Sequence, residues 1–195
     1  MQHAPSLGIT PMTVHQSADE QVLNQIAAGD RDALTELYAR YHRSLFRYLC
    51  QMTTDRGLAE EILQDTLVAV WRSAGSFQGR ASVHAWLIGV ARRQAHNSLR
   101  RQGLPTADAD ALDDLADPAT PPEELTLARA DREDFARAIG QLAPVHREVL
   151  ALNFVQGLSY GEIARVLGVP EGTVKSRLSN AKRALRSLVD SRKGE

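Results

Sequence analysis

Apolar residues recur at steps of three and four along most of the chain, which is the spacing of one buried face of an α-helix. The clearest series are Leu34, Leu37, Tyr38, Tyr41, Leu45 and Leu49, then Ile62, Leu63, Leu67, Val70 and Trp71, then Trp86, Leu87, Val90 and Ala91. No stretch shows the strict alternation of a half-buried strand, and no internal repeat is evident. The sequence therefore predicts an all-α protein.

One segment between these helical stretches has a different composition. Residues 103–124, "GLPTADADALDDLADPATPPEE", are rich in Pro, Gly, Asp and Ala and have little helical periodicity. Such a composition is typical of an extended, flexible linker rather than a packed element. We therefore expect two small helical domains joined by a flexible acidic linker. The predicted parts are a disordered tail (1–18), a first domain (19–102), the linker (103–124) and a second domain (125–195).

The second domain contains the pattern of a helix-turn-helix. Ser159 and Glu162 have the spacing of a capping box, so a helix should begin at Tyr160. Gly168 stands where a left-handed residue ends that helix, and Pro170 suits the first turn of the next one. The inward-facing residues of the two predicted helices are Ile163, Ala164, Leu167, Val174 and Leu178.

The second helix of this pair is basic on the face that we expect to be exposed. That face carries Lys175, Ser176, Arg177, Ser179, Asn180, Lys182, Arg183 and Arg186. In a DNA major groove the cations would hold phosphates, while Lys175, Ser176, Ser179 or Asn180 would reach base edges. The alternative is a helical hairpin with a solvated basic face. The capping box, the turn glycine and the basic helix together favour DNA binding.

Net charge changes the picture only when it is divided along the chain. The 195 residues carry a net charge of −1, with 24% charged and 43% hydrophobic residues, as in an ordinary soluble protein. Residues 19–102 carry +2, residues 103–134 carry −8 and residues 135–195 carry +5. Two mildly basic modules flank an acidic segment, which points to a polyanionic partner at the two ends.

Several classes of protein find no support in the sequence. The first residues lack the features of a signal peptide, and no apolar run approaches the roughly 20 residues of a membrane span. Cys50 is the single cysteine, expected to be buried, and the six histidines have no metal-ligand spacing. No nucleophile triad, phosphate-binding glycine loop or carboxylate pair is present. We expect no catalytic residue, no metal, no cofactor, no membrane insertion and a cytoplasmic location.

The order of motifs along the whole chain is more specific than the helix-turn-helix alone. "AEEILQDTLVAVWRSAGSFQGRASVHAWLIGVARRQAHNSLRR" (59–101), followed by "LAPVHREVLALNFVQGLSYGEIARVLGVPEGTVKSRL", resembles the extracytoplasmic-function (ECF, group IV) RNA polymerase sigma factors of the sigma-70 superfamily. The resemblance covers nearly all of residues 19–189. It implies that the first domain is a sigma region 2 bundle and the second a sigma region 4 helix-turn-helix. In this family region 2 opens and reads the promoter −10 element, and region 4 reads the −35 element.

The resemblance also implies roles for residues of the first domain. The polar face Glu60, Glu61, Gln64 and Asp65 would dock on the clamp helices of the polymerase largest subunit; the alternative is a solvated helix face. The loop residues Gly79, Arg80, Ala81 and Ser82 would form a pocket for a base flipped out of the −10 strand. Phe77 would support that pocket, although core packing explains it equally well. The −10 DNA would also contact the cationic stripe Arg92, Arg93, His96, Asn97 and Arg100. Many family members carry Asn where Arg93 stands, so we expect Arg93 to contact phosphate.

For the second domain, the residues expected to bind −35 DNA are Lys175, Ser176, Arg177, Ser179, Asn180, Lys182 and Arg183. The family usually has Arg-Ala-Arg where this chain has Asn180, Ala181 and Lys182, so the preferred −35 sequence should differ. The partners implied are core RNA polymerase (its clamp helices and the flap of the second-largest subunit), promoter DNA and an anti-sigma factor. The acidic linker would enter the polymerase channel and be displaced by the transcript, unless it is only a soluble spacer.

Two other classes remain to be compared. A helix-turn-helix regulator that acts without being a polymerase subunit would share the hairpin, but the response-regulator type places a phosphoacceptor α/β domain in front of it. Here the front half is predicted to be helical and lacks acidic pairs at strand ends. An enzyme with a DNA-binding tail finds no supporting residues.

Overall fold

The computed structural model describes residues 17–53, 55–104 and 137–193, and all regular secondary structure within these ranges is helical. The prediction of an all-α protein is confirmed over the described residues. The predicted linker lies outside them except for Gly103 and Leu104, and so does most of the predicted tail. Helix α1 begins at Ala18, the last residue of that tail. No helix in the described ranges combines the length and the apolarity needed to span a bilayer.

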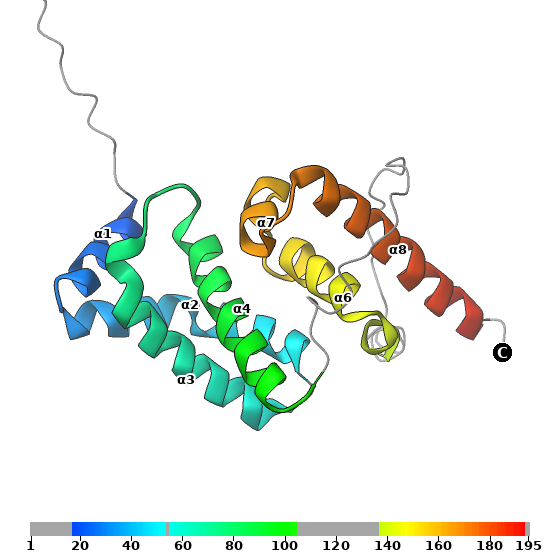
Figure 1. The fold of residues 1–195 in the computed structure, drawn as a ribbon, viewed down its shortest axis with the longest axis horizontal. Helices are drawn as coiled ribbons and strands as arrows, with labels where there is room; N and C mark the ends of the chain where they lie inside the picture. Colours follow the sequence, from blue (N-terminus) through cyan, green and yellow to red (C-terminus); the bar gives the residue numbers. More distant parts are fainter. Residues whose placement is uncertain (1–16, 54, 105–136, 194–195) are drawn as a thin grey trace, which may run out of the picture.

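Four helices and a short turn form an N-terminal group (Figure 1). Each of its α-helices begins after a residue whose side chain accepts a backbone N–H of the first turn: Ser17, Asp30, Asp55 and Ser82. Such caps satisfy donors that have no partner within the helix, so the sequence defines where each helix starts. The elements are α1 (Ala18–Ala27), α2 (Arg31–Met52), α3 (Arg56–Ser73), the 3-10 turn η1 (Ala74–Ser76) and α4 (Val83–Arg101).

The predicted apolar stripes form most of the core of this group, and three residues differ from the predicted pattern. Leu37, Leu45 and Leu49 of α2 are fully buried, as are Ile62 of α3 and Leu87 of α4. Tyr38 was expected on the stripe but is 40% exposed and stacks on the ring of His42. Tyr48 takes a buried position instead, because it lies three residues after Leu45 on the inward face. Cys50, expected to be buried, is half-buried.

A C-terminal group contains α6 (Pro144–Leu150), one π-helical turn η3 (Ala151–Val155), α7 (Tyr160–Leu167) and α8 (Glu171–Lys193). The helix-turn-helix is formed by α7 and α8. Both halves of the capping box are present: Ser159 Oγ accepts from the N–H of Glu162, and Glu162 Oε2 accepts from the N–H of Ser159. Gly168 ends α7 with a φ of 69°, in the left-handed region.

The packing inside the helix-turn-helix follows the expected residues closely. Ile163, Val174 and Leu178 are buried, whereas Ala164 and Leu167 are half-buried at the edge of the core. Pro170 lies directly before α8 rather than in its first turn, and its carbonyl accepts from the N–H groups of Thr173 and Val174. Gly168 and Pro170 therefore form the turn that joins the two helices.

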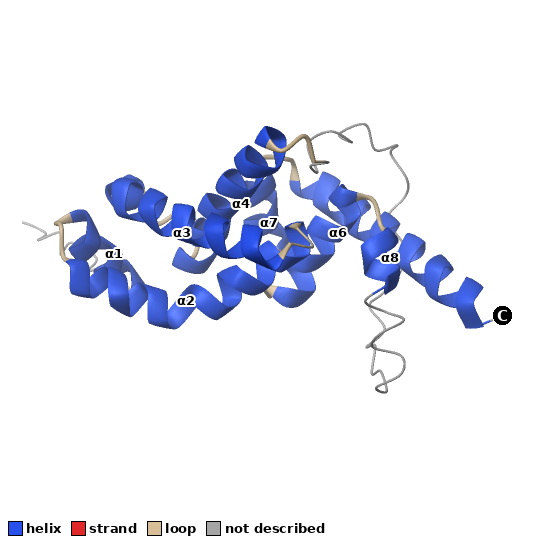
Figure 2. Ribbon diagram, turned by 90° about the horizontal axis from the view of Figure 1, so that it is seen from below, coloured by secondary structure: helices blue, strands red, loops and turns tan. Residues whose placement is uncertain are grey.

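The two groups contact each other along one side of the N-terminal group. Helix α4 packs against α7, and α2 packs against α6 and η3. Figures 1 and 2 show α8 continuing away from this junction toward the C-terminus. The junction therefore brings the helix-turn-helix next to the loop and helix that were predicted to read −10 DNA.

Candidate nucleic-acid interface

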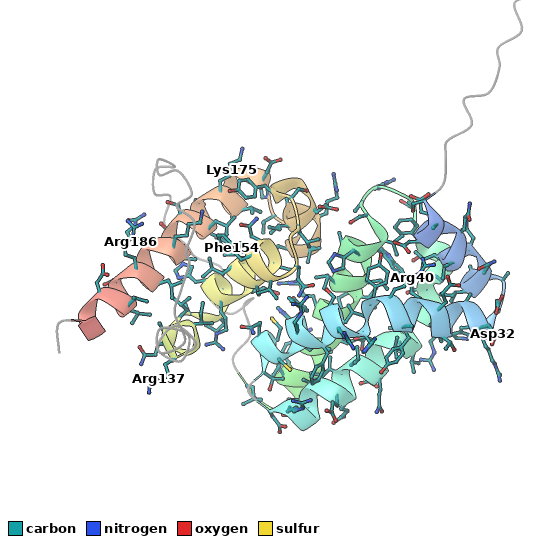
Figure 3. All side chains as sticks on the ribbon, turned by 180° about the vertical axis from the view of Figure 1, so that it is seen from behind. Asp32, Arg40, Arg137, Phe154, Lys175 and Arg186 are labelled. Carbon is teal, nitrogen blue, oxygen red and sulfur yellow. The ribbon has the colours of Figure 1, made fainter. Side chains whose placement is uncertain are left out.

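The outer face of α8 carries most of the cations predicted to bind −35 DNA. Lys175 is exposed near the start of the helix, and Arg186 is exposed further along it (Figure 3). The ammonium group of Lys175 lies 3.2 Å from the carboxylate of Glu171, one turn earlier. Arg183 donates to Asn180 Oδ1 at 2.8 Å, which uses one of the two acceptor positions of that oxygen and leaves the other for a base. These partners are local and exposed, and DNA would replace them at little cost.

Five side chains of the predicted set are less exposed than expected: Ser176, Ser179, Asn180 and Lys182 are half-buried, and Arg177 is buried. Lys182 is half-buried and places its ammonium 5.4 Å from the ring centroid of Phe154, which is 60% exposed. Arg177 was expected on the exposed face but is only 9% exposed. The reason is its register: it follows Val174 by three residues and precedes Ala181 by four, and both are fully buried. The expectation that Arg177 is exposed was wrong, and its contact with −35 DNA stays a prediction.

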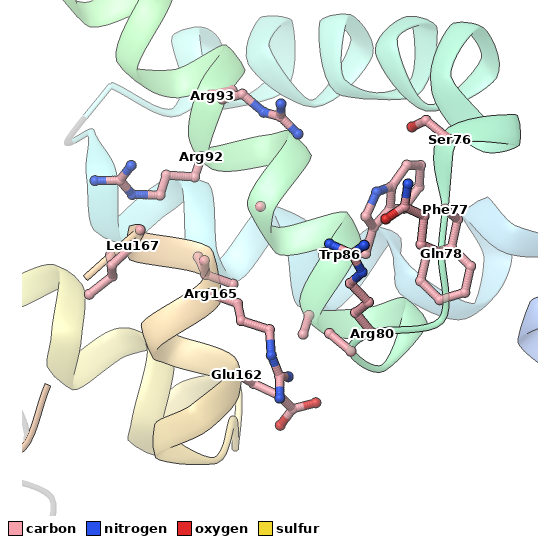
Figure 4. A pocket seen from close by; sticks show the side chains of 15 residues that line it. Ser76, Phe77, Gln78, Arg80, Trp86, Arg92, Arg93, Glu162, Arg165 and Leu167 are labelled. Carbon is pink, nitrogen blue, oxygen red and sulfur yellow. The ribbon is translucent and has the colours of Figure 1, made fainter. Parts of the chain in front are cut away.

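The loop predicted to hold a flipped base forms one wall of a cleft of about 490 Å³ (Figure 4). Gly79 turns this loop with a φ of 65°. Phe77 is half-buried and packs edge-on against Trp86, with ring centroids 5.8 Å apart, which agrees with the packing role considered for it. Arg80 and Arg93 are exposed on one side of the cleft, and Arg165 of α7 is exposed on the other.

Ser82 links this loop to the C-terminal group. Its hydroxyl oxygen accepts from the N–H of Ala85, which caps α4, and its hydroxyl donates to Glu162 Oε1 at 2.5 Å. Burial acts to raise the pKa of Glu162, but the hydrogen bonds from Ser82 and Ser159 outweigh it and hold the pKa below its ordinary value. Glu162, which belongs to the capping box of α7, thus also contacts the loop.

The stripe predicted on α4 is divided by the structure into two sets. Arg93, Asn97 and Arg100 are exposed, and Asn97 Oδ1 accepts from Arg100 at 2.9 Å. Arg92 and Arg93, although adjacent, point to different sides of α4 (Figure 4). His96 was expected to face solvent, but it is 3% exposed, and that expectation was wrong. The physical reason is that Glu148 of α6 lies against this side of α4, with its carboxylate 3.6 Å from His96 Nε2.

Arg92 and His96 meet Glu148 of α6 in a buried polar cluster, which we call the Glu148 cluster. Arg92 Nε lies 2.9 Å from Glu148 Oε1, and the hydroxyl of Tyr48 donates to the same oxygen at 2.9 Å. His96 Nε2 lies 3.6 Å from it, close enough for an ion pair when the imidazole is protonated. Burial acts to raise the pKa of Glu148, but His96 and Arg92 more than offset this and lower it. The carboxylate is therefore held ionised inside the junction.

A second polar cluster, the Gln156 cluster, lies beside it and contains Ser44, His84 and Gln156. Ser44 Oγ donates to Gln156 Oε1 at 2.5 Å, and Gln156 Nε2 donates to the carbonyl of Ser44 at 3.2 Å. His84 Nε2 lies 3.0 Å from Ser44 Oγ, and the His84 ring stacks on Tyr41. Burial lowers the pKa of His84, although Gln156 and nearby acids act in the opposite direction. Neutral imidazole is therefore the form that fits this junction.

Sequence reasoning missed Glu148, although the sequence contains a signal for it. Glu148 follows the buried Val145 by three residues and precedes the buried Leu152 by four, so a carboxylate stands on the apolar side of α6. A charge at such a position requires a partner, because an unpaired buried carboxylate is strongly destabilising. The sequence indicates the need for a partner but not which residue supplies it.

The surface predicted to meet the polymerase clamp is exposed on α3. Glu60, Glu61, Gln64 and Asp65 are all exposed, on the side away from the buried Ile62. Glu60 makes a weak pair with Arg56, at 3.5 Å between two exposed groups. Val68, 48% exposed, continues the same surface one turn later. The four polar residues are thus together and accessible, while their contact with polymerase stays a prediction.

Comparison with known proteins agrees with this arrangement of two helical groups. Residues 37–104 match the family model described as sigma-70 region 2, and residues 132–185 match the model described as sigma-70, region 4. The ECF RNA polymerase sigma factor SigM of Mycobacterium tuberculosis is 34% identical over 176 residues, covering 90% of this chain and 86% of the relative. SigX of Bacillus subtilis is 31% identical over 160 residues, covering 79% of this chain and 82% of the relative.

Solved structures show the same fold. The structure of CnrH in complex with the cytosolic domain of CnrY matches with a TM-score of 0.67 and 25% identity, over 90% of this chain and 99% of that one. The sigma factor RpoE of Bartonella quintana, in complex with the anti-sigma factor NepR, matches with a TM-score of 0.62 and 26% identity, over 80% of this chain and 96% of that one. The chain belongs to the ECF family of RNA polymerase sigma factors.

Proposed function

We propose that this protein is a promoter-specificity subunit of bacterial RNA polymerase: it binds the core enzyme, directs it to promoters and initiates transcription. The observation that carries this function is that regions 2 and 4 both match, in that order, in one chain. A regulator acting without polymerase would need only the helix-turn-helix, so the region 2 match favours the subunit. The polymerase performs the chemistry, and this protein supplies recognition and strand opening.

The decisive experiment is transcription by purified bacterial core polymerase on a DNA library with randomised −35 and −10 elements, read by sequencing transcript 5′ ends. Addition of this protein should produce new transcripts that share a −35 and a −10 sequence. No protein-dependent transcript, together with no complex with core on a sizing column, would contradict the function.

Within that function, we propose that Lys175 and Asn180 read bases of the −35 element. Both lie toward the N-terminal half of α8, and their local partners are replaceable. Each should contribute about 1–3 kcal/mol of discrimination if it contacts a base edge. Lys175→Ala and Asn180→Ala should relax the −35 sequence selected from the library, whereas Arg186→Ala, an exposed cation further along α8, should not. An equal loss on all sequences would assign both residues to phosphate contacts.

We propose that the acidic surface of α3 binds a basic surface of the core polymerase. Charge complementarity sets association rate and specificity more than final affinity. Glu61→Lys combined with Asp65→Lys should therefore slow assembly with core, with a smaller difference at high salt. Asp190→Lys on α8 makes the same type of charge change away from this surface and should leave assembly unchanged. If the α3 variant and the Asp190→Lys variant assemble with core at the same rate, the acidic surface of α3 does not bind polymerase.

Two further partners and a location belong to this proposal. The relatives of known structure are described in complex with CnrY and with the anti-sigma factor NepR, and we propose that an anti-sigma factor binds this chain as well. The polymerase flap is the proposed partner of the C-terminal group. A cytoplasmic location follows from the polymerase partner. Co-purification of the tagged protein from its native cell should recover core polymerase and one small protein in separate complexes.

A further inference from the structure

Three residues predicted to read −10 DNA each contact an acid of the C-terminal group. Ser82 donates to Glu162, Arg92 pairs with Glu148, and His96 lies beside the same Glu148 carboxylate. These residues come from the loop before α4 and from two successive turns of α4. The C-terminal group therefore covers part of the surface proposed to bind −10 DNA.

The guanidinium donors that hold the Glu148 carboxylate in this cluster are also suited to a phosphate. A guanidinium binds carboxylate and phosphate oxygens with the same donors. Glu148 accepts from two of these donors. Arg92 Nε lies 2.9 Å from Oε1, and Arg92 Nη2 lies 3.4 Å from Oε2. The Arg92 side chain is 14% exposed, and that of Glu148 is 2% exposed. While this contact is in place, a phosphate cannot use the Nε and Nη2 donors that hold Glu148.

We propose that the −10 face of the N-terminal group is also the docking surface for the C-terminal group, with Glu148 taking the place of a DNA phosphate on Arg92. The chain in this closed arrangement excludes −10 DNA from Arg92, His96 and Ser82, and promoter opening requires the two groups to separate. This inference rests on the proposed function, because it assigns a second ligand to the same surface.

The contacts across the junction suit a reversible separation. Water can replace each polar contact between the groups when they separate. These contacts involve Ser44, Ser82, Glu148, Gln156 and Glu162. The junction also includes apolar packing, because buried apolar residues of both groups form one cluster. Interfaces between domains of one chain typically allow relative motion unless they are large and apolar. Arg92 is stabilised in the closed form by a carboxylate and in the open form by water or DNA. Closure and DNA binding therefore compete for one guanidinium.

A reversible cross-link tests this competition directly in the full chain. Ser44→Cys and Gln156→Cys, in a Cys50→Ala background, place two thiols across the junction at residues outside the proposed DNA surfaces. A short bis-methanethiosulfonate reagent should join them, and a reductant should release them. The linked protein should give no library transcripts with core polymerase, and reduction should restore them. Transcription by the linked protein at the level of the reduced protein would overturn the proposal.

A second measurement tests the role of Glu148 without a cross-link. Glu148→Gln should bind a mixed-sequence single-stranded oligonucleotide at least several-fold more tightly than the unchanged chain. Asp190→Asn removes one negative charge from an exposed position of the same group, so it controls for net charge. Adding Arg92→Ala to Glu148→Gln should cancel the gain, because the released guanidinium is then absent. A gain equal to that of Asp190→Asn, or one that survives Arg92→Ala, would overturn the proposed mimicry.

The same samples report whether the groups separate. Dyes on cysteines introduced at the exposed Thr35 and Ser187 should show lower energy transfer in Glu148→Gln than in Asp190→Asn. Circular dichroism should show that both variants remain helical, and the cross-link result does not depend on either of them. If the reduced, unlinked protein gives no transcripts, the proposed function fails. If linked and reduced proteins are equally active, only the competition fails.

Discussion

Tyr48→Phe provides a quantitative test of whether the Glu148 cluster is formed in solution. The Tyr48 side chain is fully buried in the N-terminal group, and its hydroxyl donates to Glu148 Oε1 of the C-terminal group at 2.9 Å. Hydrogen bonds to charged groups contribute about 1.5–3 kcal/mol to stability. The substitution removes one hydroxyl and leaves the ring, so it creates little cavity. We expect a coupling energy of about 2 kcal/mol between Tyr48 and Glu148.

The coupling is obtained from a double-mutant cycle with Tyr48→Phe, Glu148→Ala and the combined variant. Urea unfolding followed by tryptophan fluorescence reports on the N-terminal group, because Trp71 and Trp86 both lie in it. Glu148 affects that transition only when the two groups are packed together. The cycle therefore measures the junction rather than either group alone.

The matched control is the same cycle with Tyr38→Phe in place of Tyr48→Phe. Tyr38 lies ten residues earlier on α2, roughly 15 Å along the helix, and is 40% exposed. Its coupling to Glu148 should fall within about 0.5 kcal/mol of zero. If the Tyr48 cycle also falls within that limit, the hydroxyl–carboxylate contact is not formed in solution, and the reasoning for a closed arrangement fails.

Three further predictions concern the helix-turn-helix and the junction. Ser159→Ala removes the cap of α7 and should destabilise the C-terminal group by about 1 kcal/mol, measured by thermal unfolding, with weaker −35 binding; an unchanged midpoint would contradict the capping role. The Cβ added by Gly168→Ala would meet no atom within 4 Å, so the strain of its φ of 69° should by itself cost about 1–2 kcal/mol of stability. Gly172→Ala, inside α8 and also in open space, is the control and should not destabilise the protein. Because the folded pKa of His84 is lowered, its neutral form stabilises the junction fully above the ordinary pKa of about 6.5, and this contribution is lost as the pH falls below it. Energy transfer between the dyes described above should therefore fall with pH below 6.5 and fall less in His84→Gln; identical pH profiles would exclude His84.

Much of the fold follows from local patterns in the sequence. Helix starts are set by Ser and Asp caps, which satisfy backbone donors within three residues. The capping box and Gly168 place the helix-turn-helix correctly because both act through the backbone of neighbouring residues. Apolar periodicity identifies most of the inward face of each helix, but on α2 it includes the exposed Tyr38 and omits the buried Tyr48. The family resemblance, carried by motif order, predicted the functional class that the comparisons show.

The sequence by itself determined the helices, their buried faces, the turn chemistry and the class of protein, because each depends on residues close together in the chain. Tertiary structure alone decided the surroundings of Arg92 and His96. A helical face predicts exposure only until another element packs on it, and α6 lies more than 40 residues away from α4 in sequence. The partner of Glu148 is decided in the same way, since an ion pair across a junction depends on how two groups dock. Local periodicity carries no information on how the two groups dock, so only the structure could identify the junction.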